Sequence, residues 1–503
     1  MRRQTLLFLL FTLFAASASA QPNHPDRINC TQFMAWTAGG MSSQRLTRLA
    51  QQRGIDFSLN ATTSRALLAA GAPPALLENL RATAAGSISS DPDQLDAAVC
   101  PAPLAHAGEL IQQKKYQEGQ SLLQKLIAAD PGNASLYFAL GYVHQQQEDW
   151  DEALSAYQNS QQLMPGLSDV HSRSAYILYR TDDANSAIDE ARTALSIDPR
   201  NAEAYRFLGL ALYANLQYAA SVHAFQESLA REPNNADVYY DLGMTLADKG
   251  DIDASAAAYR KALVLNPQLW EAHNNLGMLL HDLKSFDGAI AEYLEAKRLA
   301  PDDSVVRSNL GNAYCDKGDY SAAITEFREL FRRDPGWQNG HSCLARALMS
   351  RRDYESAIVE LRAAILQNPT GPDEHRYLGQ TLLLMHHQPE AVRELRLAVQ
   401  LDPDSPLAHH YLATALFSGD DFQAAEIEFR QALRLQPTAN NHYYLAACLM
   451  SMRHYDAALA ELDTAARLEP AQDLYRTRKR ELLKLMQASS PAKPLDLKSQ
   501  NGK

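Results

Sequence analysis

Proline recurs along this chain at a fixed spacing of 34 residues. Ten prolines keep this spacing: Pro131, Pro165, Pro199, Pro233, Pro267, Pro301, Pro335, Pro369, Pro403 and Pro437. Pro470 follows 33 residues after the last of them. A fixed period of this length is typical of repeat proteins, in which one supersecondary unit recurs and buries its apolar face only against similar neighbours. The spacing therefore predicts a linear array over most of the chain.

The period divides residues 100–472 into eleven repeats when each proline is placed at position 32. The repeats begin at Cys100, Ala134, Ser168, Ala202, Ala236, Trp270, Ser304, Gln338, Pro372, Pro406 and Ala439. A small residue recurs at position 8, as in Gly141 and Gly209, and another at position 20, as in Ala153 and Ser221. Helices that pack closely need small residues where they meet, because a larger side chain would hold them apart. Each repeat is therefore predicted to be a pair of packed helices, and the fold all-α.

Local signals set the expected helix boundaries within each repeat. A turn signal such as Gly250-Asp251 stands near positions 15 and 16, and a bulky residue such as Tyr218 opens the second helix at position 17. The periodic proline ends that helix, because proline cannot continue it and restricts the residue before it. Four residues are expected to cap the first helix that follows them: Asn133, Asn201, Asn235 and Asp303.

These features together resemble the tetratricopeptide repeat: small residues at positions 8 and 20, aromatic residues near 17 and 24, and proline at 32 in a period of 34. The resemblance covers roughly residues 100–472. It implies a right-handed α-solenoid of about eleven helix-turn-helix units. Some repeats depart from the pattern, since Gly119 stands at position 20 of the first, Ala184 and Ala191 at positions 17 and 24 of the third, and Gln388 at position 17 of the ninth.

The N-terminus has the features of a leader. Arg2 and Arg3 precede a short apolar run, Leu6 to Ala16, and Ala18-Ser19-Ala20 gives an A-x-A cleavage signature. Residues 1–20 are therefore predicted to be a secretory signal peptide. We expect an exported bacterial tetratricopeptide repeat protein, periplasmic or associated with the cell envelope. No later stretch reaches the roughly 18 to 20 unbroken apolar residues of a membrane span, so no transmembrane segment is expected.

Residues 21–85 do not follow the period of the repeats. Short helical patterns that end at glycine, such as Ser43 to Arg53 before Gly54, predict a small helical module there. Residues 86–99 are rich in serine and aspartate and are expected to link this module to the array. No motif in the module indicates a role for it.

The segment after the last repeat, residues 473–488, is predicted to be a capping helix. Leu474, Leu482 and Leu485 fall on one side of it, and lysines and arginines surround the rest. A basic amphipathic helix that touches anionic lipid is the alternative interpretation. Residues 489–503 have little apolar content and are expected to be disordered.

Charge and cysteine content restrict the partners further. The net charge is −12, which argues against nucleic acid, because its binders need a basic surface. Cys30 and Cys100 flank the module. A bridge between them would close a loop of about 70 residues, worth on the order of 4 kcal/mol, whereas two buried free thiols are the other alternative. The remaining cysteines fall inside repeat helices, where a packing role is expected: Cys315, Cys343 and Cys448.

Histidine recurs at position 4 of six repeats: His171, His273, His341, His375, His409 and His442. Packed helices lie roughly 8 to 10 Å apart, whereas the ligands of one zinc ion each lie about 2 Å from it. We therefore expect packing histidines and no metal site. If these rings are buried and neutral, acid should weaken the C-terminal half of the array. No nucleophile elbow, phosphate loop or paired carboxylates stand out, so neither catalysis nor a cofactor is expected.

The resemblance also implies a binding face. In this family the first helices line a concave groove through positions 2, 5, 9, 12 and 13. The implied groove residues here are Phe138, Tyr142, Tyr176, Tyr179, Arg206, Tyr213, Tyr240, Met244, Asn274, Met278, Asn312, Arg346 and Arg376. Aromatic residues and methionines anchor peptides through desolvated area, and amides can hydrogen-bond an extended backbone. Alternatively, several of the tyrosines pad the contact between successive first helices.

Three functions fit these observations. The first is a non-catalytic scaffold of the cell envelope that binds an extended peptide or a partner protein in its groove. The second is an accessory subunit of an envelope enzyme or of a secretion or assembly complex, and the third is a glycan-binding array. No feature of the sequence indicates an oligomeric state.

Overall fold

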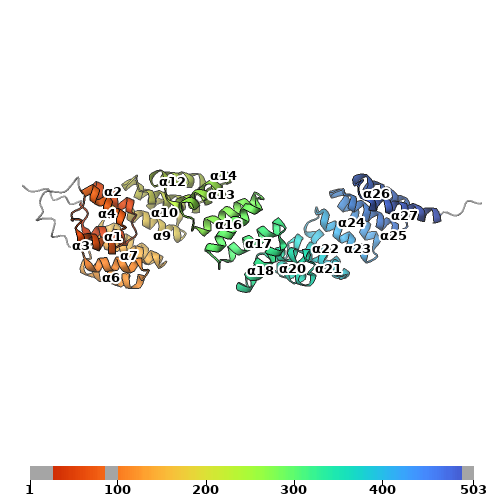
Figure 1. Ribbon diagram of the computed structural model, residues 1–503, viewed down its shortest axis with the longest axis horizontal. Helices are drawn as coiled ribbons and strands as arrows, with labels where there is room; N and C mark the ends of the chain where they lie inside the picture. Colours follow the sequence, from red (N-terminus) through yellow and green to blue (C-terminus); the bar gives the residue numbers. More distant parts are fainter. Residues whose placement is uncertain (1–26, 85–99, 490–503) are drawn as a thin grey trace, which may run out of the picture. The chain divides into compact units, whose positions relative to one another are not determined.

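The computed structural model describes residues 27–84 and 100–489, and within these ranges all regular structure is helical apart from one isolated β-bridge between Ile28 and Ile55 (Figure 1). The predicted signal peptide and the predicted linker lie outside the described residues. Of the predicted C-terminal tail, the structure describes only Ser489, the last residue of the final helix. An all-α fold was predicted and is confirmed.

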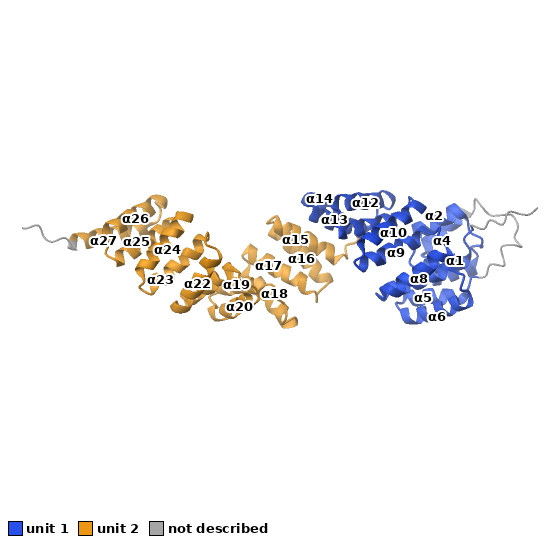
Figure 2. Cartoon of the chain, turned by 180° about the vertical axis from the view of Figure 1, so that it is seen from behind, with its two compact units in different colours: residues 1–265 blue, residues 266–503 orange. Residues whose placement is uncertain are grey.

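The chain divides into two compact units, residues 1–265 and residues 266–503 (Figure 2). Unit 1 starts with the small module, which consists of α1 (Cys30–Ala38), α2 (Ser43–Arg53), α3 (Ala61–Ala69) and α4 (Pro74–Ala84). Five repeats follow in unit 1: α5 (Ala102–Gln112) and α6 (Tyr116–Ala129), α7 (Ala134–Gln146) and α8 (Trp150–Leu163), α9 (Ser168–Arg180) and α10 (Ala184–Ile197), α11 (Ala202–Ala214) and α12 (Tyr218–Arg231), α13 (Ala236–Lys249) and α14 (Ile252–Leu265).

Unit 2 contains the other six repeats and a final helix. Its elements are α15 (Trp270–Asp282) and α16 (Phe286–Leu299), α17 (Ser304–Lys317) and α18 (Tyr320–Arg333), α19 (His341–Ser350) and α20 (Tyr354–Gln367), α21 (Pro372–Leu384) and α22 (Gln388–Leu401), α23 (Pro406–Ser418) and α24 (Phe422–Leu435), α25 (Ala439–Ser451) and α26 (Tyr455–Leu468), and α27 (Asp473–Ser489). Within each unit, the first helix of a repeat packs on its own second helix, and that second helix packs on the next first helix.

The helix boundaries follow the sequence period closely. Nine first helices begin at position 1 of their repeat, and every second helix begins at position 17. The helix α19 is an exception, since it begins at His341 rather than at Gln338. Its cap, Gly340, has φ 107°, and this left-handed backbone delays the start of the helix. The side chains of Asn201, Asn235 and Asp303 cap the following helices as predicted, but Asn133 makes no such hydrogen bond.

The small residue at position 8 makes room for the large one at position 24. Gly209 on α11 faces the fully buried ring of Phe225 on α12, and a Cβ atom at Gly209 would lie 2.6 Å from that ring. At position 20, the hydroxyl of Ser221 donates a hydrogen bond of 2.7 Å to the carbonyl oxygen of Gly209. Where position 24 is small, as at Ala191, the facing residue is Ala175 rather than glycine. The two helices of a repeat therefore pack closely only where the side chains at positions 8 and 24 are not both large.

Gly209→Ala is expected to lower the free energy of unfolding of unit 1 by about 1–3 kcal/mol, because overpacking displaces a buried ring or the backbone. Gly166→Ala is the matched control, since a Cβ atom there would meet nothing within 4 Å and the expected change is within about 0.5 kcal/mol. Urea unfolding of both variants measures the difference. Equal stabilities of the two variants would contradict the predicted contact.

The final helix α27 packs on α26. Its buried residues are Tyr475, whose ring centroid lies 5.6 Å from that of Tyr443, and Leu482. Of the three leucines that fall on one side of this helix, Leu482 is buried, whereas Leu474 and Leu485 are exposed. Tyr475 and Leu482 are seven residues apart and therefore share a helical face, and this face is the one that meets the array.

Candidate functional site

Every predicted groove residue lies on the first helix of a repeat, from α7 to α21. We call these residues the inner-face residues. The structure places them in three different situations. Some are covered by the N-terminal module, some are tied to a neighbouring helix by polar contacts, and some remain open.

The module covers the inner face of the first repeats. Its helix α1 packs on α5 and α7, the first helices of repeats one and two. The ring of Phe138 is fully buried, and a Cβ atom at Gly39 would lie 2.7 Å from it. A Cβ atom at Gly40 would lie 2.6 Å from the ring of Tyr142. Two glycines at the end of α1 thus let the module approach both rings, which contact this chain itself rather than a free ligand.

A disulfide bond holds the module in place. The sequence left open whether Cys30 and Cys100 are bridged or free, and the structure has the bridge. It joins the first residue of α1 to the segment just before α5. One continuous core runs from the module into the array, including Phe33 and Leu46 of the module and Tyr157 of the array. The module is therefore an integral part of unit 1.

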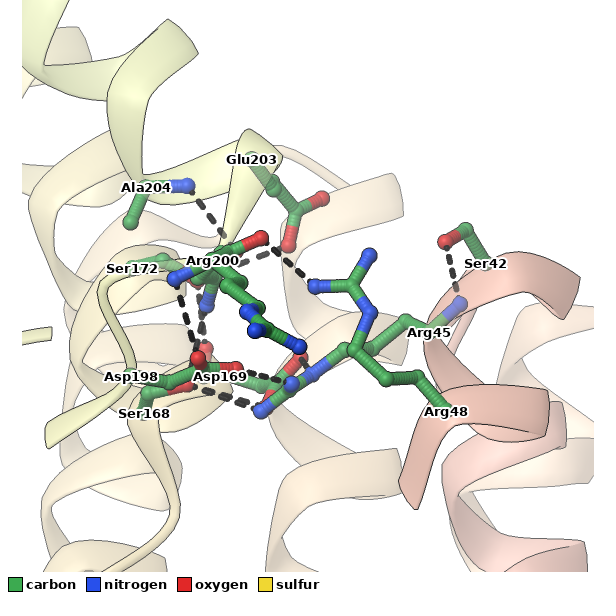
Figure 3. A network of polar contacts seen from close by, with 11 residues as sticks. Ser42, Arg45, Arg48, Ser168, Asp169, Ser172, Asp198, Arg200, Glu203 and Ala204 are labelled. Atoms are coloured by element: carbon green, nitrogen blue, oxygen red, sulfur yellow. Dashed lines mark hydrogen bonds and ion pairs between the residues drawn. The ribbon is translucent and has the colours of Figure 1, made fainter. Parts of the chain in front are cut away.

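A buried arginine of the module is clamped by the array (Figure 3). Arg45 on α2 is 6% exposed, and its Nε and Nη2 atoms donate hydrogen bonds of 2.9 Å and 2.7 Å to the two carboxylate oxygens of Asp169 on α9. Its Nη2 atom also donates to the hydroxyl of Ser168 at 2.9 Å, and its Nη1 atom pairs with Asp198. Burial opposes the charged guanidinium, but the two carboxylates outweigh this effect and the pKa of Arg45 is raised.

A second arginine links the array back to the module. The Nη2 atom of Arg173 donates a hydrogen bond of 3.0 Å to the carbonyl oxygen of Gly40 and lies 2.9 Å from the Oε1 atom of Glu203. Sequence reasoning missed Arg45, Asp169 and Arg173. The signal that indicates Asp169 and Arg173 is the concentration of polar residues on α9, the first helix of the third repeat.

Other inner-face residues of unit 1 tie successive first helices together. Arg206 on α11 donates from Nε to the Oδ2 atom of Asp241 on α13 at 2.7 Å. The hydroxyl of Tyr213 donates to the Oδ2 atom of Asp248 at 2.5 Å, and burial and this hydrogen bond raise its pKa. These contacts agree with the alternative that some of the predicted groove residues pad the contact between first helices.

Aromatic rings make the same kind of link. The ring centroids of Tyr176 on α9 and Phe207 on α11 lie 5.0 Å apart, and Tyr179, on the same helix as Tyr176, has its ring centroid 6.4 Å from that of Tyr176. Tyr240 and Met244 on α13 are half-buried. The inner face of unit 1 is therefore covered at its start by the module and internally braced beyond it.

The inner face of unit 2 is more open. Met278 on α15 is 46% exposed, and the side-chain amide of Asn312 on α17 has no hydrogen-bond partner among the described residues. Asp316 on α17 joins the neighbouring first helices, since its carboxylate lies 3.2 Å from Nε2 of His281 on α15 and 3.5 Å from Nη1 of Arg346 on α19. We call these five residues the open row: Met278 and Asn312 make no polar contact with a neighbouring first helix among the described residues, whereas Asp316 is paired with His281 and Arg346.

Two predicted residues of unit 2 do not belong to the open row. Asn274 is buried and accepts a hydrogen bond of 3.0 Å from the Nδ2 atom of Asn309. Arg376 is also buried, pairs with Asp373 at 2.6 Å, and its guanidinium carbon lies 4.1 Å from the ring centroid of Tyr377. Burial lowers the pKa of Arg376, but the hydrogen bonds with Asp373 and Tyr377 outweigh it, so its pKa is raised.

Comparison with known families identifies the repeats. Two models, each described as tetratricopeptide repeat, match this sequence. One matches residues 173–236, 208–269, 240–304, 308–372 and 378–440, which make up more than half of the chain, and the other matches residues 110–159. The chain belongs to the tetratricopeptide repeat family. A comparison with curated protein sequences found no significant match.

Three solved structures are similar to this tetratricopeptide repeat protein at low sequence identity. A chain of the APC/C hetero-tetramer Cut9-Hcn1 is 16% identical, with 76% of this chain and 90% of that chain covered and a TM-score of 0.39. Yeast Tom70 is 15% identical, with coverages of 76% and 93% and a TM-score of 0.31. Pseudomonas aeruginosa pilF is 18% identical, with coverages of 44% and 97% and a TM-score of 0.38. At these identities the likeness concerns the fold alone.

The histidines at position 4 of the tetratricopeptide repeats form ion pairs within single repeats. Each ring lies within 2.8 Å of a glutamate nineteen residues later: His171–Glu190, His273–Glu292, His341–Glu360, His375–Glu394, His409–Glu428 and His442–Glu461. In repeat seven the same place holds Arg307, which lies 2.9 Å from Glu326. The expected weakening by acid assumed neutral packing rings. That expectation stays a prediction.

Cysteine pairing in unit 2 corrects another expectation. Cys315 on α17 and Cys343 on α19 were expected to be packing thiols, but they form a disulfide bond. Their Cα atoms lie 6.3 Å apart because the two first helices are direct neighbours. Cys448 is a free buried thiol, and burial raises its pKa to about 11.

Across residues 27–84 and 100–489, none of the helices combines the length and the apolar character that a membrane crossing needs. Within the same ranges, histidine, cysteine, aspartate and glutamate side chains do not gather in threes as a metal site would require.

Proposed function

We propose that this tetratricopeptide repeat protein is a non-catalytic scaffold of the cell envelope that holds an extended segment of a partner protein on the open row of unit 2. The family supports a role in protein interaction. The observation that carries the proposal is the exposed side chain of Met278, together with the amide of Asn312, which makes no hydrogen bond to any described residue.

The chemistry of the open row fits a peptide. Met278 offers an adaptable apolar anchor, and methionine-rich surfaces accommodate varied side chains. The amide of Asn312 can both donate to and accept from a peptide backbone, and Arg346 and Asp316 offer charges of both signs. The carboxylate of Asp316 holds three neighbouring first helices in register, so these groups are already placed before a partner binds.

Two observations support export to the envelope. The sequence of residues 1–20 has the charge, apolar run and cleavage signature of a signal peptide. The disulfide bonds Cys30–Cys100 and Cys315–Cys343 agree with this, because disulfides persist in oxidising compartments and are rare in the cytosol.

Site-specific photo-crosslinking in living cells of the native host tests the proposal. A photoreactive residue at Met278 or at Asn312 is expected to capture a discrete partner protein. Glu295 on α16 is the matched control, since it is an exposed residue of a second helix in the same repeat as Met278. A probe at Tyr142 is expected to react with the module of its own chain, because Gly40 lies against that ring.

Capture from both open-row positions and not from Glu295 would establish the row as the binding surface and would identify the partner. Equal capture from all of these positions, or no capture from the open row, would contradict the proposed surface. A captured enzyme or secretion component would also distinguish an accessory subunit from a free-standing scaffold.

A further inference from the structure

A cavity of about 100 Å³ lies where the module meets the array in unit 1. Ser42, Arg45 and Arg48 of the module line one side, and the array contributes Glu203 and Glu232 among other residues. The disulfide bond and the continuous core hold the module on the array, so the cavity is a lasting feature of the fold. It has room for several water molecules or for one small charged group of a ligand.

Most charged side chains around this cavity already form ion pairs. Arg45 pairs with Asp169, Arg206 pairs with Asp241 at 2.7 Å, and the Oε1 atom of Glu203 lies 2.9 Å from Arg173. These pairs hold the walls in place. A ligand would compete poorly for them, because breaking a buried ion pair leaves a charge without compensation.

Two charged side chains at the cavity, Arg48 and Glu232, form no ion pair with a described residue. Arg48 uses its Nη1 atom to donate a hydrogen bond of 2.6 Å to the carbonyl oxygen of Arg200 (Figure 3), and it has no ion pair within 27–84 and 100–489. The carboxylate of Glu232 has neither a hydrogen bond nor an ion pair with any described residue. Burial raises the pKa of Glu232, while Arg48 and Arg45 act to lower it.

A second hollow of about 310 Å³ shares two lining residues with this cavity. Glu232 and Asn235 line both spaces, and the second one is also lined by Gln44, Asn234 and Asp237. The charged groups that line this second space are carboxylates, and the others are amides and an alanine. Such a lining favours a cationic or strongly hydrogen-bonding group.

We propose that these two spaces form a composite binding site for a small zwitterion, namely an α-amino acid with a cationic side chain. The carboxylate of the ligand lies on the guanidinium of Arg48, and its α-ammonium group lies on the carboxylate of Glu232. Its side-chain cation extends into the second space, where it meets the carboxylate of Glu232 and the half-exposed carboxylate of Asp237, which also lies 3.3 Å from Nη1 of Arg206. Both unmatched charges of the cavity are satisfied in this arrangement, and neither the module nor the array provides the site alone.

Isothermal titration of the mature full-length protein with L-lysine tests this site. Lysine is expected to bind. Norleucine, which lacks the side-chain amine, and cadaverine, which lacks the carboxylate, are each expected to bind at least about tenfold more weakly, as for the loss of one charge-assisted hydrogen bond. Arg48→Gln and Glu232→Gln are each expected to weaken lysine binding by a similar factor.

Matched variants separate charge from packing. Arg192→Gln on α10 removes an exposed arginine whose closest carboxylate, Asp189, lies 3.9 Å away, and it should leave lysine binding unchanged. Arg48→Lys retains the positive charge and should keep most of the affinity even if the contact with Arg200 is altered. No heat from millimolar lysine, equal binding of lysine and cadaverine, or full affinity in Arg48→Gln would overturn the site and leave a water-filled crevice.

Discussion

Arg45→Ala is expected to lower the free energy of unfolding of unit 1 by about 3–5 kcal/mol, the cost of removing one partner from a buried ion pair. The side chain of Asp169 is 3% exposed, so its carboxylate would stay buried without a counter-charge. Asp198 and the hydroxyl of Ser168 would lose their contacts as well. Urea unfolding, with hydrogen exchange followed on peptides from α2 and α9, measures both the size and the location of the loss.

Two comparisons make this result specific. Arg65→Ala on α3 removes an exposed arginine of the same module and should change stability by less than about 0.5 kcal/mol. The double variant Arg45→Ala with Asp169→Ala should lose less than the sum of the two single variants, because it leaves no orphaned carboxylate at Asp169. A loss below about 1 kcal/mol in Arg45→Ala would mean that the clamp is not a buried ion pair.

Removing the module's disulfide bond is expected to have an effect of similar size. The double variant Cys30→Ser with Cys100→Ser should lower the free energy of unfolding by about 4 kcal/mol in the chain-entropy model, since the bridge closes a loop of about 70 residues. Hydrogen exchange should show the loss of protection in α1, α5 and α7, because α1 packs on both of these first helices. The ring of Phe138 would then be less well shielded from water.

The second disulfide bond supplies the control. The double variant Cys315→Ser with Cys343→Ser removes the disulfide bond of unit 2. Its loss of hydrogen-exchange protection should be confined to the neighbourhood of α17 and α19. In repeat arrays each repeat contacts its neighbours only, so local destabilisation stays local. If the unit 1 variant kept full protection in α1, the core rather than the bridge would be what holds the module.

The sequence predicted the array well because its determinants are local. The proline period, the small residues at positions 8 and 20 and the bulky residue at position 17 act within one repeat or between adjacent ones. Helix starts, caps such as Asn201 and the contact of Gly209 with Phe225 follow from them. The delayed start of α19 at Gly340 departs from this pattern because one glycine adopts a left-handed backbone there.

The site was less predictable for a physical reason. The sequence indicated which first-helix positions form the inner face, but not which of them stay free. Arg45 and Asp169 lie 124 residues apart, and Arg173 and Gly40 lie 133 residues apart. No local pattern encodes such a contact, because its energy exists only when both segments are folded and buried together. The six histidines at position 4 differ from these pairs, because each contacts a glutamate only nineteen residues later, on the second helix of its own repeat.

The amino-acid sequence by itself determined the repeat, its period, its two helices and the family to which they belong, because these depend on neighbouring residues and on a spacing that recurs. Tertiary structure alone decided that the module covers Phe138 and Tyr142, that the pairs Cys30–Cys100 and Cys315–Cys343 are bridged, and that Met278 and Asn312 stay open. These outcomes depend on burial and on charges brought together from distant parts of the chain, and burial is a property of the packed molecule.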